Sequence, residues 1–87
     1  MDIFFISAKD CEKCAKVKDW LHTISSYEDI QIHEIDSESE EAICVAIEKG
    51  IDDIPGVAIG RYSVCGETVS YVDIEEIIRE ALSETGS

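Results

Sequence analysis

The sequence predicts an α/β domain in which a mixed four-stranded sheet is covered by three helices. Three observations support this fold class. The chain opens on an apolar run rich in β-forming residues, helical and β-like segments then alternate, and two adjacent β-like segments precede a last amphipathic segment. The predicted order is therefore β-α-β-α-β-β-α. With 87 residues, the chain has room for a single domain, which we assign to residues 1–87.

The N-terminal part is predicted to form a parallel β-α-β unit. Asp2 to Ser7 is nearly continuously apolar, as in strands that are buried on both faces of a sheet. Asp10 is a suitable N-cap for a helix that begins at Cys11 and ends at Ser25-Ser26. One apolar stripe at helical spacing marks this helix: Cys14, Val17, Leu21 and Ile24. Isoleucines mark the second strand: Ile30, Ile32 and Ile35.

The second predicted helix follows a capping-box pattern, Ser37-Glu38-Ser39-Glu40. Lys49-Gly50 ends it, because a cation and then a glycine suit a helix C-terminus. Its apolar residues predict one buried face: Ile43, Ala46 and Ile47.

An antiparallel hairpin and a final helix complete the predicted fold. The third strand runs from Val57 to about Tyr62, and the fourth from Glu67 to about Tyr71, with a turn near Cys65-Gly66. Asp73 is the expected N-cap of the last helix, and Ser83 to Ser87 form a polar tail. The apolar stripe of that helix is regular: Ile74, Ile77, Ile78, Ala81 and Leu82.

Composition excludes several classes of partner. A formal net charge of −13 disfavours nucleic acid and anionic membrane surfaces. No apolar run approaches the roughly 20 residues that span a bilayer. The run from Ile3 to Ile6 is too short for the core of a signal peptide, so we expect a cytoplasmic protein. In that reducing compartment, four cysteines suggest chemistry or metal binding rather than structural disulfides.

The positive charge is concentrated around two of the cysteines. Cys11 and Cys14 form a Cys-x-x-Cys motif, and four of the seven basic residues lie in the ten-residue segment around it: Lys9, Lys13, Lys16 and Lys18. This segment carries a net charge of +2, including Asp10 and Glu12, whereas the rest of the chain carries −15. The cysteine pair is therefore predicted to lie in a cationic neighbourhood.

The motif suggests a pair of redox-active thiols. Only the thiolate of cysteine is a nucleophile, and a helix N-terminus and nearby lysines such as Lys9 and Lys13 favour it. With Cys11 at the helix start, Cys14 lies one turn further along the same face. We therefore expect Cys11 to be the exposed attacking thiol and Cys14 the partly buried resolving thiol.

A metal site is the competing interpretation of the motif. A closed structural zinc site needs four ligands, which would have to include Cys44 and Cys65. The predicted fold puts Cys44 midway along the second helix and Cys65 at the tip of the hairpin, away from Cys11. A redox pair is therefore favoured, no metal site is assigned, and packing or incidental exposure accounts for Cys44 and Cys65.

With these features in place, the chain resembles the thioredoxin and glutaredoxin families. Phe4 to Leu21 (FFISAKDCEKCAKVKDWL) resembles their apolar strand, short loop, Cys-x-x-Cys and helix, and the element order matches nearly throughout. Ile54-Pro55 falls where those families carry a residue followed by a cis-proline that faces the cysteines. The resemblance implies a thioredoxin-like fold and a substrate segment that pairs with the backbone at Ile54. Lys9, Glu12 and Lys13 complete the expected substrate-binding surface.

The chain also departs from these families. Glu12-Lys13 lies between the cysteines in place of the Gly-Pro of thioredoxins or the Pro-Tyr of glutaredoxins, and Phe5 occupies the position of the buried thioredoxin carboxylate. The glutaredoxin Gly-Gly that helps to hold glutathione is missing, which favours a protein or another small thiol as the reductant.

Two functions follow as hypotheses. In the first, the chain is a monomeric enzyme that reduces protein disulfides through Cys11 and Cys14, needs no cofactor beyond that pair, and is recharged by a reductase or a small thiol. In the second, it is a non-catalytic module of the same fold that binds a metal or a partner through the motif.

Overall fold

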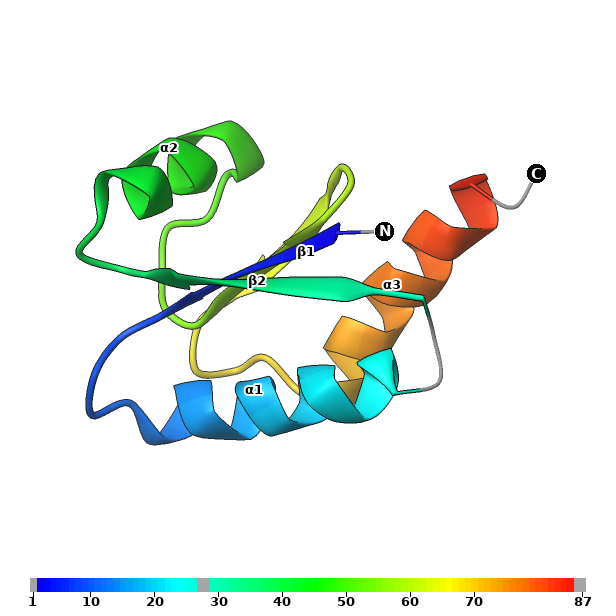
Figure 1. The fold of residues 1–87 in the computed structure, drawn as a ribbon, viewed down its shortest axis with the longest axis horizontal. Coiled ribbons are helices and arrows are strands. Elements are labelled where there is room, and N and C mark those ends of the chain that lie inside the picture. The colour runs from blue at the N-terminus through cyan, green and yellow to red at the C-terminus, as the bar shows by residue number, and fades with distance from the viewer. Residues whose placement is uncertain (1, 27–28, 86–87) are drawn as a thin grey trace.

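The computed structural model describes residues 2–26 and 29–85 and confirms the predicted element order. The elements are β1 (Asp2–Ser7), α1 (Glu12–Ser25), β2 (Gln31–Asp36), α2 (Glu40–Lys49), β3 (Gly56–Ile59), β4 (Tyr62–Cys65) and α3 (Tyr71–Thr85). The strands form one mixed sheet in the order β2-β1-β3-β4, with helices on both of its faces (Figure 1). Within the described ranges, no helix is long and apolar enough to cross a membrane.

Strand pairing brings the end of β1 next to the start of β3. β1 pairs in parallel with β2 and antiparallel with β3, and Ile6 lies opposite Gly56. The loop that leads from β1 into α1 and the loop that leads from α2 into β3 therefore meet at one end of the sheet. This is the end that holds Cys11, Ile54 and Pro55.

The two faces of the sheet are packed very differently. α1 and α3 lie on one face and α2 lies on the other (Figure 1). The α1/α3 face carries the larger apolar core, which includes Ile3, Phe5 and Leu21. The α2 face carries a smaller cluster: Ile6, Ile35, Ala42, Ile51 and Ala58. Because β1 and β3 are apolar on both faces, they contribute to both clusters, as the continuous run in β1 predicted.

The predicted position of the hairpin was wrong. β3 ends at Ile59 and β4 spans Tyr62 to Cys65, so the turn is at Gly60-Arg61 rather than at Cys65-Gly66. Gly60 has a φ of 59°, a conformation that tight two-residue hairpin turns require. Only Gly60-Arg61 interrupts the apolar residues from Val57 to Tyr62, so the sequence favours one strand where the structure has a strand, a turn and the start of the next strand.

The predicted apolar face of α2 is wrong at Ile43 and Ile47 but correct at Ala46. Ile43 and Ile47 are 57% and 78% exposed, whereas Ala42 is buried and Val45 and Ala46 pack against the smaller core. The predicted stripe (Ile43, Ala46 and Ile47) and the observed one (Ala42, Val45 and Ala46) are both apolar at helical spacing, so periodicity alone does not distinguish them. The stripe of smaller side chains is the one that faces the sheet.

Two predicted helix starts need correction. α2 is capped by Ser39, whose hydroxyl accepts a hydrogen bond from the Ala42 amide, and not by Ser37. α3 begins three residues before Ile74, because Ser70 and Asp73 bond reciprocally to each other's backbone amides. α3 also continues to Thr85, into the predicted polar tail, while residues 86 and 87 lie outside the described ranges.

Candidate functional site

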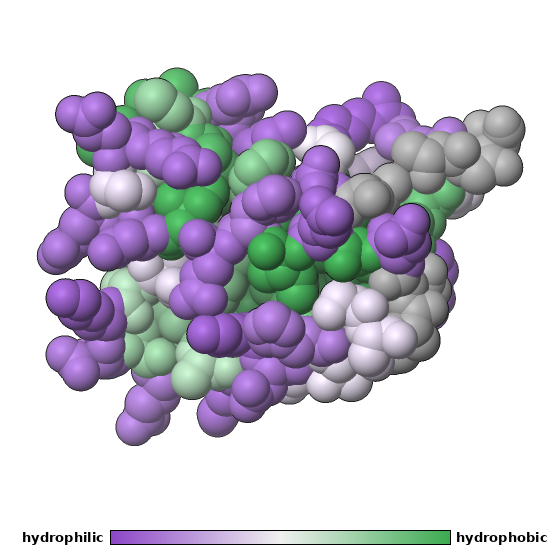
Figure 2. Space-filling view, in the orientation of Figure 1, coloured by the Kyte–Doolittle hydropathy of each residue, from purple (hydrophilic) through white to green (hydrophobic). Residues whose placement is uncertain are grey.

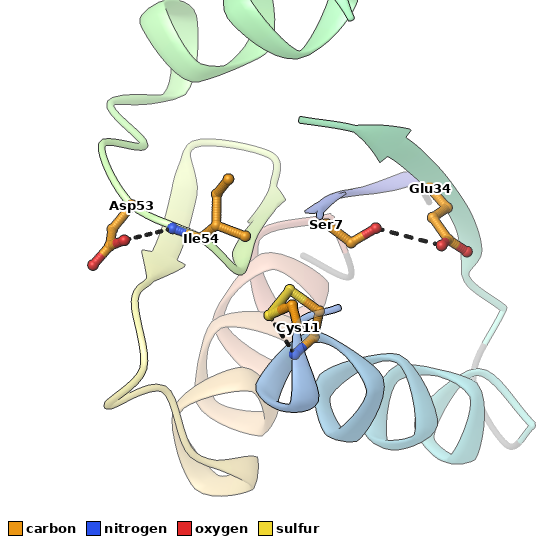
Figure 3. Close-up of a disulfide and its surroundings, with 6 residues drawn as sticks. Ser7, Cys11, Glu34, Asp53 and Ile54 are labelled. Carbon is orange, nitrogen blue, oxygen red and sulfur yellow. Dashed lines mark hydrogen bonds between the residues drawn. A yellow bond between two sulfur atoms is a disulfide. The ribbon is translucent and has the colours of Figure 1, made fainter. Parts of the chain in front are cut away.

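The candidate site is built around a disulfide between Cys11 and Cys14 at the start of α1 (Figure 3). Their Cα atoms are 5.2 Å apart. This lies within the range of about 4.4–6.8 Å that disulfides require. Two cysteines three residues apart across the first helical turn are therefore close enough to form a disulfide.

Cys11 is the N-cap of α1, a position that the sequence analysis had assigned to Asp10. The Cys14 amide donates a hydrogen bond to the Cys11 sulfur at 3.1 Å, so sulfur satisfies one of the free amides of the first turn. Asp10 adopts a φ of 57°, which aspartate tolerates better than most residues. This local kink places Cys11 rather than Asp10 above the helix end.

The two sulfurs differ in burial as predicted. Cys14 is 4% exposed and belongs to the larger core, whereas Cys11 is half-buried and packs at the edge of that core. Cys11 is therefore the sulfur that a partner reaches first. The amide hydrogen bond and the positive end of the α1 dipole both favour a negative charge on it when the disulfide is open.

Ile54 and Pro55 lie at the same end of the sheet as the disulfide (Figure 3). Their peptide bond is cis, as the resemblance implied. Ile54 packs against the same core as Cys11 and Cys14, while Pro55 is fully buried. The Ile54 amide donates to the Asp53 side chain at 2.8 Å, and the Pro55 carbonyl accepts from Gly66.

The three charged residues expected to surround the cysteines lie in different places. Glu12 and Lys13 line a hollow beside Cys11, together with Lys16 and Glu67. The Lys13 ammonium lies 5.1 Å from the ring centroid of Trp20 and so is directed along α1. Lys9 is exposed in the loop before the disulfide and lines a separate hollow.

A polar group that the sequence does not predict, around Glu34, lines a hollow next to the disulfide. A cavity of about 500 Å³ is lined by both cysteines and by Ser7, Lys18 and Glu34. The Glu34 carboxylate accepts a hydrogen bond from the Ser7 hydroxyl at 3.4 Å (Figure 3). It also pairs with the Lys18 ammonium at 3.1 Å. Glu34 lies opposite Phe5 in the parallel register of β1 and β2, so strand pairing was the signal that could have revealed it.

The other two cysteines are separated from the disulfide. Cys44 is exposed on α2, and Cys65, which was predicted at the hairpin tip, ends β4 opposite Gly56. Cys65 therefore reaches the same end of the sheet as Cys11, but it packs on the α2 face and its thiol contacts Asp52 at 3.4 Å. The described residues contain no group of three or more His, Cys, Asp or Glu placed to hold a metal ion.

Comparison with known proteins identifies the fold. No protein-family model matches the sequence, and no curated protein matches it either. Among solved structures, thioredoxin 1 from Thermosipho africanus is similar over 100% of both chains, with a TM-score of 0.74 and 20% identity. Thioredoxin O2 from Arabidopsis thaliana is similar over 91% of this chain and 72% of its own (TM-score 0.67, 13% identity). A chain in the complex of ferredoxin:thioredoxin reductase with thioredoxin f2 is similar over 92% and 76% (TM-score 0.65, 17% identity).

These likenesses agree with the topology derived from the sequence. They show that the four strands and three helices adopt the thioredoxin-like fold.

Proposed function

Because the chain has the thioredoxin-like fold, we propose that it is a thiol–disulfide oxidoreductase that reduces disulfides of partner proteins through Cys11 and Cys14. One observation carries the proposal: the half-buried Cys11 sulfur caps α1 and accepts the Cys14 amide, with Cys14 buried directly beneath it. A sulfur in this position is both reachable and stabilised as an anion, which is what an attacking thiol needs.

The reaction proceeds by two exchanges. The Cys11 thiolate attacks one sulfur of the substrate disulfide, the substrate S–S bond breaks, and the leaving sulfur departs as a thiolate that takes up a proton. Cys14 then loses its proton and attacks the Cys11 sulfur in the mixed disulfide, which releases the second substrate sulfur. The substrate gains two electrons and two protons, and the chain keeps the Cys11–Cys14 disulfide.

The neighbouring residues suit this reaction. Ile54 is proposed to contact the substrate segment, since it lies at the same end of the sheet as the sulfurs, while the fully buried Pro55 is proposed to hold the Ile54 backbone in position. Lys9, Glu12 and Lys13 are proposed to face the partner at the rim. The structural likeness to a chain from a complex of thioredoxin f2 with its reductase supports a protein reductant, which would act here in the cytoplasm with no further cofactor.

The test is to trap the mixed disulfide. In the Cys14→Ser variant the resolving thiol is missing, so incubation with a disulfide-containing protein such as insulin should accumulate a covalent adduct through Cys11, identified by mass. Cys44→Ser is the matched control, because it removes an exposed cysteine away from the site. That variant should reduce insulin at the unaltered rate and form no lasting adduct.

The opposite result is equally clear. If Cys14→Ser forms no adduct and the unaltered chain reduces neither insulin nor a small aromatic disulfide, the proposed activity is wrong. Tight zinc binding by the reduced pair in the same samples would favour the non-catalytic module instead.

A further inference from the structure

A second feature of the surface lies on α2, on the opposite face of the sheet from α1. Ile43 and Ile47 are four residues apart and therefore share one face of the helix, and both are largely exposed. Figure 2 shows apolar surface among polar side chains over this helix. Neighbouring exposed aliphatic side chains on a small domain commonly mark a contact surface for another molecule.

A hollow extends from this face of α2 to Ile54, at the end of the sheet that holds the disulfide. It has a volume of about 340 Å³, and its lining includes Ile43 from α2 together with Ile51 and Ile54 from the loop that follows. Ile54 precedes Pro55 and packs against the core that holds the disulfide. A segment that occupied this hollow would therefore reach Ile54, which packs against the same core as Cys11.

The rim of the hollow is acidic. Asp52 and Asp53 line it, and both are exposed. α2 adds further exposed carboxylates, which are Glu40, Glu41 and Glu48.

The one basic residue of α2 does not neutralise this rim. The Lys49 ammonium donates to the Gly60 carbonyl at 2.7 Å, which directs it toward the β3–β4 turn. An aliphatic floor with a carboxylate rim is complementary to an aliphatic side chain flanked by cations.

We propose that the hollow and the adjoining Ile43 and Ile47 bind a segment of the disulfide-bearing partner that presents an aliphatic side chain flanked by lysine or arginine. This inference rests on the proposed function for the identity of the partner, but the binding itself requires no redox chemistry. The two helices then have different roles, because α1 supplies the sulfurs and α2 binds the segment of the partner.

The experiment measures binding of labelled peptides to the oxidised full-length chain by fluorescence polarisation. The basic probe contains isoleucine flanked by lysines and no cysteine, the acidic probe replaces the lysines by glutamates, and the polar probe replaces isoleucine by serine. We expect the basic probe to bind about tenfold more tightly than the acidic probe at low salt, with most of this difference lost near about 1 M salt.

Variants assign the binding to the surface. The double variant Ile43→Ser/Ile47→Ser should bind the basic and the polar probe equally well. The double variant Asp52→Asn/Asp53→Asn should bind the basic and the acidic probe equally well. Val72→Ser is the matched control, because Val72 is 59% exposed on α3, a helix on the other face of the sheet, and should leave both preferences intact.

Three outcomes would overturn the inference. The first is equal affinity for the three probes, and the second is a set of preferences that survives in both double variants. The third is a concentration-dependent dimer that Ile43→Ser/Ile47→Ser dissociates, because a second copy of the chain would then occupy the hollow. Reduction of a small aromatic disulfide is assayed in parallel. If the chain does not reduce this disulfide, the proposed function is wrong, but the result of the binding experiment is unaffected.

Discussion

α1 and α2 begin with the same capping geometry but use it for different purposes. The Cys11 sulfur accepts the Cys14 amide at 3.1 Å, and the Ser39 hydroxyl accepts the Ala42 amide at 3.2 Å. In α2 the acceptor only completes the hydrogen bonds of the helix end. In α1 the acceptor is a sulfur that can carry a negative charge and exchange disulfides. Changing only the capping atom therefore turns a position that stabilises the helix into one that can carry out disulfide exchange.

The same helices differ in how firmly they are anchored. α1 buries four side chains along one stripe: Cys14, Val17, Leu21 and Ile24. Within the described residues of α2, only Ala42 is fully buried, and two isoleucines remain exposed. The sulfurs are therefore held on the well-packed helix, whereas the lightly packed helix keeps apolar surface available for a partner.

The largest expected effect comes from changing the capping atom of α1. Cys11→Ser should reduce disulfide turnover to the uncatalysed level, because a hydroxyl cannot replace the thiolate in exchange. It should still cap α1 as Ser39 caps α2, so the reduced variant should be more stable than reduced Cys11→Ala by about 1 kcal/mol. Insulin reduction and urea unfolding measure the two effects. Equal stability of the two variants would refute the capping role of residue 11.

The next effect concerns the anchoring of α1. Leu21 is 1% exposed in the larger core. Leu21→Ala should lower the free energy of unfolding by about 2–5 kcal/mol, because it removes buried apolar surface and leaves a cavity. Chemical denaturation followed by circular dichroism measures this. A loss below about 1 kcal/mol would show that α1 is no better anchored than α2.

A smaller effect is expected from the cap of α2. Ser39→Ala removes the acceptor of the Ala42 amide and should lower the free energy of unfolding by about 1 kcal/mol. Insulin reduction should be unchanged, because Ser39 is remote in sequence and role from the sulfurs. Ser37→Ala is the matched control and should be more stable than Ser39→Ala, because the structure assigns the cap to Ser39. If Ser37→Ala were the less stable variant, Ser37 would be the cap, as the sequence predicted.

The smallest effect is expected on the exposed face of α2. Ile47 is 78% exposed. Ile47→Ala should change the free energy of unfolding by no more than about 0.5 kcal/mol, as surface substitutions usually do. The contrast with Leu21→Ala, measured under the same conditions, is the test of unequal anchoring. A loss similar to that of Leu21→Ala would show that Ile47 is part of the core.

The sequence predicted the elements whose signals are strong and local. The apolar run of β1, the stripe of α1 and the Lys49-Gly50 stop of α2 were all confirmed. Gly50 indeed ends α2 in a left-handed conformation, with a φ of 72°. In each case a single periodicity or a single residue type points to one structure.

Predictions failed where two local choices had similar signals. Gly60 and Gly66 both adopt positive φ, and the sequence does not show which of them closes the hairpin. Asp10 and Cys11 both suit the start of α1, and only the kink at Asp10 decides between them. The Glu34–Lys18 pair joins β2 to α1, so it depends on strand register and was not visible along the chain.

The most direct test of the proposed Cys11–Cys14 redox pair is a redox titration of the metal-free protein across thiol/disulfide buffers, with free thiols trapped and each cysteine assigned by mass. We predict one reversible transition in which Cys11 and Cys14 close together, following about 30 mV per tenfold change in the ratio of oxidised to reduced protein, as two electrons require. Cys44 and Cys65 should stay trapped as thiols throughout. If Cys11 and Cys14 form no disulfide, or if the disulfide involves Cys44 or Cys65 instead, the proposed redox pair is wrong.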